Sequence, residues 1–324
     1  MIGTSLQKTS LSPLSLSKIY TSMCISRLLY GSEIRHISES ELDLYEFHMK
    51  MAKEIQCLPQ NCPDPVPLST LGWKKIEHLI DIAKLRFGHM ILSLHSESVF
   101  RLIFVKRYYS TLANEVSHYM SPAAQFIAVC RKYRLLHIIE DWLASGLLPG
   151  KMAWKGQYVK AVNDYIFARW RLQLRLCRKL ADFRVVQIFI EPSVWWKISR
   201  INVRLKKNCC NMIKLLSGCD RLRINTDIEV PVEQRICTLC DLNKIDDLYH
   251  MVMECKHSID TRNMLYLKIK NCIVDADYRH FISLSKQMQF YILIGLVYPF
   301  CDESIDQIRY FSCQGISKMY IAHG

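Results

Sequence analysis

Apolar residues recur at intervals of three and four along most of this chain, which is the spacing of helices that bury one face. The longest run is 73–94, and 42–56, 122–143, 155–180, 259–273 and 281–296 have the same periodicity. Short strands are compatible with the pattern only near 222–228 and around Cys237. The pattern therefore predicts a mainly α protein.

Proline and glycine interrupt this periodicity at several places. Four prolines fall between 59 and 67, and Gly146, Pro149 and Gly150 form a second break. From these breaks and from the motifs below we expect three regions. They are a helical region at 1–148, a basic helical connector at 149–230, and a cysteine-rich module with C-terminal helices at 231–324.

Positive charge is concentrated in the connector. The chain of 324 residues has a formal net charge of +13, and 160–215 holds thirteen Lys and Arg against three acidic residues. On a helix, Arg171, Arg175 and Arg178 would share one face. Such a surface favours a polyanionic partner, with Trp195 and Trp196 available for base stacking. The alternative is a solvated amphipathic helix whose tryptophans belong to the core. The candidate nucleic-acid-binding residues are Arg169, Arg171, Arg175, Arg178, Lys179, Arg200, Arg204, Lys206, Lys207 and Arg235.

Four metal-ligand side chains follow the connector at the spacing Cys237-x2-Cys240-x9-His250-x4-Cys255. Three thiolates and an imidazole satisfy the tetrahedral preference of Zn²⁺ and leave no open position for a substrate. The pattern predicts a structural zinc site, with His250 early on a helix and Cys255 near its end. A chance arrangement in a chain with fourteen cysteines is the alternative, and His257 is a rival ligand.

The sequence has no pattern of a secreted or membrane-spanning protein. The first 17 residues lack a continuous apolar segment, and the apolar stretch at 290–301 is short and contains Pro299. We therefore expect a nuclear or cytoplasmic protein with free thiols and no membrane partner.

Several segments carry a resemblance to one family. The segment from Arg235 through Cys237, Cys240, His250 and Cys255 to Arg262 resembles the C-terminal zinc knuckle of non-LTR (LINE-type) retrotransposon proteins. The Leu-Leu-Tyr-Gly-Ser-Glu motif at 28–33 and segments within 71–87, 149–159 and 215–226 are similar to the region past the polymerase palm of that family. The likeness is colinear over about 16–300. It implies a thumb-like region at 1–148, a connector, and a CCHC knuckle that binds RNA or DNA.

The catalytic parts of that family are missing. Its polymerase needs a Tyr- or Phe-Ala-Asp-Asp box that holds two metal ions, whereas this chain has only Leu180-Ala-Asp182-Phe183. The endonuclease domain is missing as well. We therefore expect no catalytic residue and no enzyme activity, with nucleic acid contacted by the connector and by a surface near Arg235 and Lys244.

Three other interpretations are compatible with the sequence. The chain could be a protein-interaction module, because knuckles also bind proteins. It could be an enzyme fragment that a separate palm-containing reverse transcriptase chain completes. It could also be a decayed copy of a mobile element with no present function.

Overall fold

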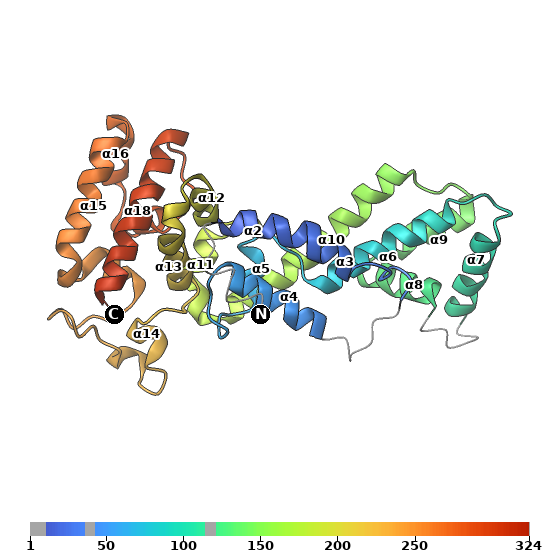
Figure 1. The fold of residues 1–324 in the computed structure, drawn as a ribbon, viewed down its shortest axis with the longest axis horizontal. Helices are drawn as coiled ribbons and strands as arrows, with labels where there is room; N and C mark the ends of the chain where they lie inside the picture. Colours follow the sequence, from blue (N-terminus) through green and yellow to red (C-terminus); the bar gives the residue numbers. More distant parts are fainter. Residues whose placement is uncertain (1–10, 36–42, 114–120, 324) are drawn as a thin grey trace. The chain divides into compact units, whose positions relative to one another are not determined.

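A computed structural model describes residues 11–35, 43–113 and 121–323, and over these residues the protein is built from helices (Figure 1). The described part of the chain contains no strand; its one isolated bridge pairs Ile236 with Ile245. The mainly α prediction is confirmed. The strand allowed at 222–228 is wrong, because a short helix, α14 (Arg223–Thr226), forms there. None of the helices formed by the described residues is both long and apolar enough to cross a membrane.

The chain divides into two compact units. The middle unit comprises 19–49 and 74–171, and the terminal unit comprises 1–18, 50–73 and 172–324. These limits do not coincide with the boundaries expected at 148/149 and 230/231. The predicted connector is itself divided at 171/172, because its long helix α10 (Lys151–Leu176) contributes its first part to the core of the middle unit.

The middle unit packs its helices around a continuous apolar core. Phe126, Tyr133 and Trp154 are buried in it, and the indole of Trp154 donates a hydrogen bond to the carbonyl of Leu85 at 3.0 Å. Gly88 lets α6 approach the ring of Phe126 closely. The helices of this unit, besides η1 (Thr21–Ile25) and α3 (Ser26–Leu28), are the first part of α4 (Asp43–Ile55), α6 (Ile76–Leu92), α7 (Val99–Leu112), α8 (Pro122–Lys132), α9 (Leu136–Ser145) and most of α10.

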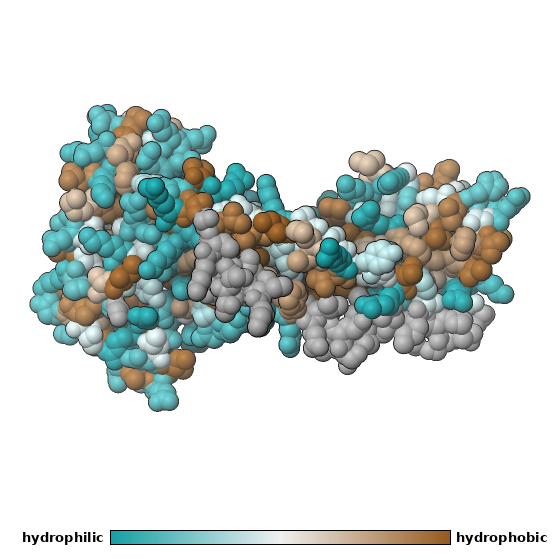
Figure 2. Space-filling view, in the orientation of Figure 1, coloured by the Kyte–Doolittle hydropathy of each residue, from teal (hydrophilic) through white to brown (hydrophobic). Residues whose placement is uncertain are grey.

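The terminal unit is organised around its last helix, α18 (Asp302–His323), which the sequence analysis did not anticipate. This helix packs against α12 (Val194–Ile201), α13 (Lys206–Leu216) and α15 (Ile259–Cys272), as Figure 1 shows. The smaller elements are α5 (Pro65–Ser69), η3 (Arg178–Leu180), α11 (Ala181–Val186), η4 (Val203–Leu205), η5 (Val232–Gln234), η6 (His250–Glu254), η7 (Lys256–Ser258), α16 (Asp275–Ser283) and α17 (Lys286–Leu293). Hydrophilic side chains predominate on the face of this unit seen in Figure 2.

Three of the predicted helices are confirmed with small changes at their ends. The pattern at 42–56 corresponds to α4 (Asp43–Ile55), with Leu42 outside the described residues. The patterns at 73–94 and 259–273 correspond to α6 and α15. Each of these helices ends within two residues of its predicted end.

Three other predicted helices are interrupted. The stretch 122–143 is two helices, α8 and α9, separated at Arg134, whose φ is +58°. The helix predicted at 155–180 ends at Leu176, because the backbone of Cys177 is extended. Arg178 therefore lies on a separate 3-10 turn and does not share a helical face with Arg171 and Arg175. The stretch 281–296 is divided between α16 and α17, where Ser285 caps the second helix.

Candidate metal centre and basic surface

The four predicted metal ligands come together in the terminal unit. One ligand atom from each of Cys237, Cys240, His250 and Cys255 lies within 4.8 Å of the other three. The Sγ atoms of Cys237 and Cys255 are 4.0 Å apart, and Nε2 of His250 is 3.3 Å from Sγ of Cys240. Ligands at tetrahedral corners with ordinary zinc bond lengths would be about 3.8 Å apart for two sulfurs and about 3.5 Å apart for sulfur and nitrogen. The cluster can therefore hold a metal ion.

The first two ligands lie on a tight turn between paired backbone segments. The N–H of Cys237 donates to the carbonyl of Lys244 at 2.9 Å, and the N–H of Asp246 donates to the carbonyl of Arg235 at 2.8 Å. The turn between them includes Asn243, whose φ is +49°, a conformation that asparagine tolerates better than most residues. This pairing holds both ends of the Cys-x2-Cys turn.

The other two ligands are brought to one face by a wide helical turn. In a regular α-helix, residues five apart point about 140° away from each other. Here η6 is a π-helix, and the N–H of Cys255 donates to the carbonyl of His250 five residues earlier at 2.7 Å. Asp247 accepts the N–H of His250 at 2.7 Å and fixes the start of this turn. The spacing of five residues therefore places His250 and Cys255 on one face, because the helix is locally widened.

Two thiols of the cluster must lose a proton before they can bind a metal ion. Burial, reinforced by the neighbouring Cys255, raises the pKa of the Cys237 thiol to about 12, and burial also raises the pKa of Cys255. Nδ1 of His250 is buried without a hydrogen-bond partner, and its nearest carboxylate oxygen, on Glu254, is 3.5 Å away. A divalent ion would offset the mutual repulsion of the thiolates, and its binding would release their protons.

Two residues that the sequence analysis missed lie beside this cluster. Nε2 of His323, near the end of α18, is 2.8 Å from Oδ1 of Asp246 and 3.8 Å from Sγ of Cys237. Cys237, Asp246 and His323 also satisfy the geometry of a metal-binding group. The sequence gives no signal for His323, because only the tertiary packing of α18 brings it to the knuckle.

Two basic residues near the metal cluster interact with nearby groups of the protein itself. The guanidinium of Arg235 donates to the carbonyls of Ile224, Val230 and Ile228 at 2.7, 2.8 and 3.2 Å. Lys244 pairs with Glu254 at 2.6 Å. The Arg235 guanidinium therefore stabilises the folded loop, whereas Lys244 is paired but half-exposed, and the nucleic-acid surface expected around these two residues stays a prediction.

The tryptophans near the basic stretch belong to the core. Trp195 and Trp196 are both 0 % exposed, and the indole of Trp196 donates to Oε1 of Gln56 at 2.8 Å. Neither ring offers a face to a base. The alternative that these aromatics are core residues is the one that the structure supports.

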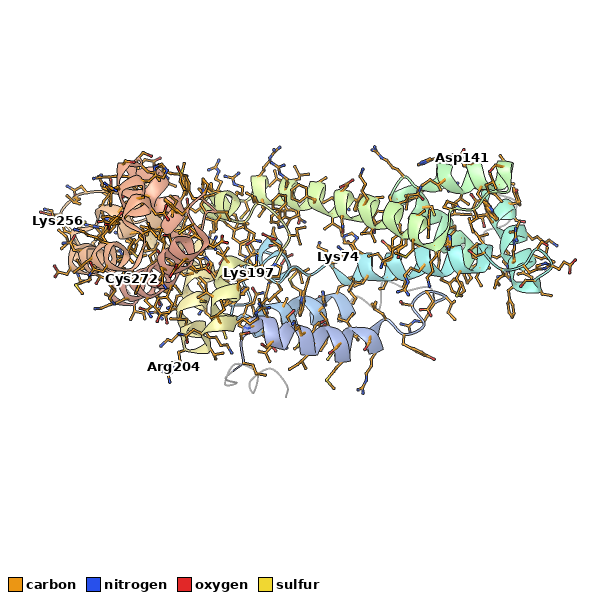
Figure 3. All side chains as sticks on the ribbon, turned by 90° about the horizontal axis from the view of Figure 1, so that it is seen from above. Lys74, Asp141, Lys197, Arg204, Lys256 and Cys272 are labelled. Carbon is orange, nitrogen blue, oxygen red and sulfur yellow. The ribbon has the colours of Figure 1, made fainter. Side chains whose placement is uncertain are left out.

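A group of exposed cations remains on the terminal unit along α12, η4 and the start of α13. The segment 192–219 contains six Lys and Arg and no acidic residue. We call four of its exposed cations the basic surface: Lys197, Arg200, Arg204 and Lys207. None of the four forms an ion pair with an acidic residue in the part of the chain that the structure describes. Figure 3 shows Arg204 projecting outward, and Lys206 lies half-buried beside Lys207.

The remaining predicted nucleic-acid residues are divided between the two units. In the middle unit, the guanidinium of Arg169 stacks on Tyr165, and that of Arg171 stacks on Phe167. In the terminal unit, Lys179 donates to a backbone carbonyl at 3.3 Å. Arg175 and Arg178, also in the terminal unit, are exposed and form no ion pair with the described acidic residues. The predicted cations therefore do not form one continuous surface along a single helix.

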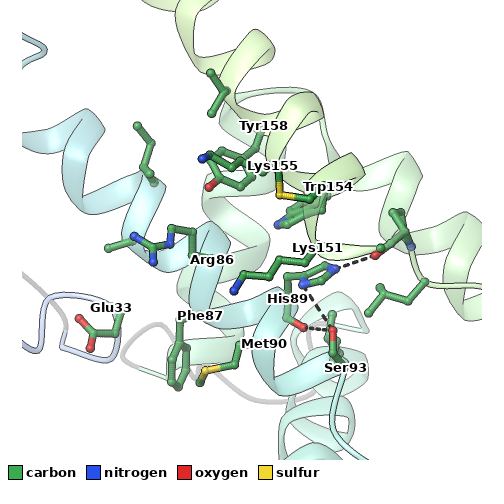
Figure 4. Close-up of a pocket in the computed structure, with 18 of the residues that line it drawn as sticks. Glu33, Arg86, Phe87, His89, Met90, Ser93, Lys151, Trp154, Lys155 and Tyr158 are labelled. Atoms are coloured by element: carbon green, nitrogen blue, oxygen red, sulfur yellow. Dashed lines mark hydrogen bonds between the residues drawn. The ribbon is translucent and has the colours of Figure 1, made fainter.

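The middle unit contains a cavity of about 1500 Å³ that the sequence analysis did not predict. Figure 4 shows Arg86, Lys151 and Lys155 around it, with Glu33 at one side. His89 also lines it, but Nε2 of this ring donates to the carbonyl of Pro149 at 2.7 Å. The cationic side chains outnumber the single carboxylate, so the cavity would attract anions.

Comparison of the chain with protein-family models, with curated proteins and with solved structures finds no match. The resemblance to non-LTR retrotransposon proteins thus rests on the motifs quoted above.

Proposed function

We propose that this chain is a zinc-binding protein that contacts RNA or DNA through the phosphate backbone. We further propose that it is related to the C-terminal region of non-LTR retrotransposon reverse transcriptases and has no polymerase or endonuclease site of its own. The observation that carries the nucleic-acid proposal is the basic surface: four exposed cations in a segment without an acidic residue.

The metal of this proposal is Zn²⁺. Three sulfurs and one imidazole nitrogen are its usual structural ligand set, and four protein ligands fill its tetrahedral shell. When bound, the ion cross-links the turn that carries Cys237 and Cys240 to the helical turn between His250 and Cys255. It has no free position at which to activate water, so its role is to fold the knuckle.

Nucleic-acid contact through this surface would be electrostatic. Each Lys or Arg that contacts a phosphate releases counterions, so affinity falls steeply with salt. The burial of Trp195 and Trp196 removes the stacking platform that would favour particular bases or single strands. We therefore propose binding to duplex DNA and to RNA without strong preference for sequence.

A matched pair of charge-reversal variants tests this proposal. Arg200→Glu/Arg204→Glu/Lys207→Glu removes most of the basic surface, whereas Lys268→Glu/Lys270→Glu/Lys286→Glu makes the same change in net charge at exposed positions elsewhere on the terminal unit. Fluorescence anisotropy with a labelled duplex, over a range of salt concentrations, gives the slope of log affinity against log salt. The first variant should reduce that slope by about 2 to 3, and the second should leave it near the wild-type value.

Two outcomes would refute the nucleic-acid proposal. The first is that the zinc-loaded wild-type chain binds neither RNA nor duplex DNA at low salt. The second is that both triple variants lose affinity equally, because this result would indicate attraction by net charge without a defined surface.

The family resemblance implies one further partner, a reverse transcriptase chain that contains the palm. Adding this protein to such a chain, with a primed template, should change nucleotide incorporation only if the two chains associate. The protein alone should incorporate none.

A further inference from the structure

A second group of metal-ligand atoms lies between Cys237 and the end of α18. Sγ of Cys237, Oδ1 of Asp246 and Nε2 of His323 all lie within 4.8 Å of one another. Nε2 of His323 is 2.8 Å from Oδ1 of Asp246 and 3.8 Å from Sγ of Cys237. This group shares only Cys237 with the four-ligand cluster. Thiolate, carboxylate and imidazole are all ligands that Zn²⁺ takes in proteins.

The backbone pairing that holds the Cys-x2-Cys turn also positions Asp246. In paired antiparallel segments, side chains one step to either side of a bridge point to the same face. Cys237 and Asp246 flank the bridge between Ile236 and Ile245 in this way. A backbone N–H donates to Oδ2 of Asp246 at 2.9 Å, so Oδ1 is the oxygen that a metal ion can bind.

Tertiary packing brings the third ligand to this face. His323 follows the buried residues Ile316 and Met319 at spacings of seven and four, so it belongs to the buried face of α18. α18 also contacts η6, which begins with His250. The side chains of His323 and Asp246 are almost fully buried. All three ligands are therefore held by contacts that do not depend on a second metal ion.

The charge around the cluster favours a second cation. Three thiolates bound to one divalent ion leave one negative charge, and the carboxylate of Asp246 adds another. Lys244 and Lys256 are each paired with a carboxylate of their own, at 2.6 and 2.8 Å, and Arg262 donates to two backbone carbonyls. Burying negative charge without a partner is costly, and a second divalent ion would offset that cost.

We propose that Cys237, Asp246 and His323 form a second metal site, at which a second Zn²⁺ shares the thiolate of Cys237 with the ion of the four-ligand cluster. This inference rests on the proposed zinc site, because a shared thiolate requires the first ion. The second ion takes the place of the proton between His323 and Asp246. Tetrahedral ligands with ordinary zinc bond lengths place nitrogen and oxygen about 3.4 Å apart, so the contact between these two side chains opens by about 0.6 Å when the ion binds.

The two sites differ in coordination and in affinity. The first ion has four protein ligands, whereas the second has three, and water or a small anion completes its shell. The second ion also displaces a hydrogen bond and is repelled by the first. The first ion therefore binds more tightly, and the contact between His323 and Asp246 stays a hydrogen bond until the free zinc concentration is high. The open position of the second ion is the place where an external ligand would bind.

Native mass spectrometry of the full chain, in reducing buffers of increasing free zinc, counts the bound ions. Wild type should pass from one ion to two, whereas Asp246→Asn and His323→Gln should stop at one. His257→Ala is the matched control and should still reach two, because this exposed ring lies 6.4 Å from the ring of His323 and is not part of the group. Wild type that stays at one ion, or a second ion that both variants retain, would overturn the second site.

Cadmium NMR tests the shared thiolate. With cadmium in place of zinc, the first equivalent should give one resonance and the second equivalent another. The first resonance should shift at the second step, because Cys237 changes from a ligand of one ion to a bridge between two. In His323→Gln the first resonance should appear alone. A second resonance that leaves the first unmoved would place the second ion elsewhere and overturn the proposal, whereas wild type that binds no ion at all would refute the proposed zinc site itself.

Discussion

Nε2 of His323 lies 2.8 Å from Oδ1 of Asp246, and this contact joins the last turn of α18 to the loop that carries Cys237. Both side chains are almost fully buried, with 4 % and 6 % of their surface exposed. Oδ2 of Asp246 accepts the N–H of Arg223 at 2.9 Å. Although burial raises the pKa of Asp246, the hydrogen bonds from His323 and Arg223 lower it overall. The C-terminal helix thus supports the metal cluster from outside its four ligands.

Replacing His323 should weaken metal binding without removing a ligand. His323→Ala leaves the buried carboxylate of Asp246 without its partner and loosens the loop that positions Cys237. Losing such an outer partner lowers metal affinity by about 10- to 100-fold. Competition with a chromophoric chelator measures the change, and His137→Ala, at an exposed position in the middle unit, is the control. Equal affinity of His323→Ala and wild type would mean that α18 does not support the site.

Removing the metal should unfold the knuckle but leave the middle unit intact. The knuckle has little regular structure of its own, and structural zinc sites contribute about 10 kcal/mol or more to folding. Hydrogen exchange after treatment with a chelator should therefore show loss of protection over 222–258, with α6, α8 and α10 of the middle unit unchanged.

Replacing one of the four metal ligands tests the same site without a chelator. Cys240→Ser should show the same loss of protection in the presence of zinc, and Cys272→Ser should behave as wild type. Unchanged protection over 222–258 in Cys240→Ser would show that the cluster is not a structural metal site.

The sequence predicts local features of this protein better than its tertiary ones. The ligand spacing correctly predicted that Cys237 and His250 come close together, because both belong to one short segment whose backbone pairs with itself. The breaks at Arg134 and Cys177 were not visible, since the apolar periodicity continues across them and neither residue is a typical helix breaker. Periodicity also does not show whether an aromatic residue such as Trp195 lies on the buried face or the exposed one.

The pattern of apolar residues did not predict contacts between segments that are distant in the sequence. His323 reaches Asp246 only because α18 packs against α12, α13 and α15. The sequence alone shows that positive charge is concentrated in 160–215. However, the role of each cation depended on its neighbours, as the three carbonyls around Arg235 show.

A partly buried carboxylate, that of Asp182, should make the stability of the terminal unit depend on pH. Burial, and to a lesser degree the nearby Asp247, raises the pKa of Asp182 to about 6, against 3.8 for the ordinary group. The folded state therefore holds this proton up to a higher pH than the unfolded state, so ionised Asp182 disfavours folding above about pH 6. This penalty fades as the pH falls toward about 4.

The variant Asp182→Asn isolates that penalty. It should raise the free energy of unfolding by about 2 kcal/mol at about pH 8 and by much less at about pH 4. Urea denaturation of variant and wild type at each pH measures the difference, and any loss of metal in acid is common to both. Asp260→Asn, at an exposed position on α15, should have no such pH-dependent effect. A stabilisation by Asp182→Asn that is the same at both pH values would mean that ionisation of Asp182 does not disfavour folding.

Two glycines in helices of the middle unit should respond oppositely to the same substitution. A Cβ at Gly88 would lie 2.2 Å from the ring of Phe126, which is 1 % exposed and has no room to move. Gly88→Ala should therefore destabilise the middle unit by about 1 to 3 kcal/mol. A Cβ at Gly156 on α10 would meet no atom within 4 Å. Gly156→Ala should stabilise the helix by about 0.5 to 1 kcal/mol, because alanine restricts the unfolded chain more. Urea denaturation of both variants measures the two signs, and an equal stabilisation by both would mean that α6 and α8 do not pack as closely as the structure has them.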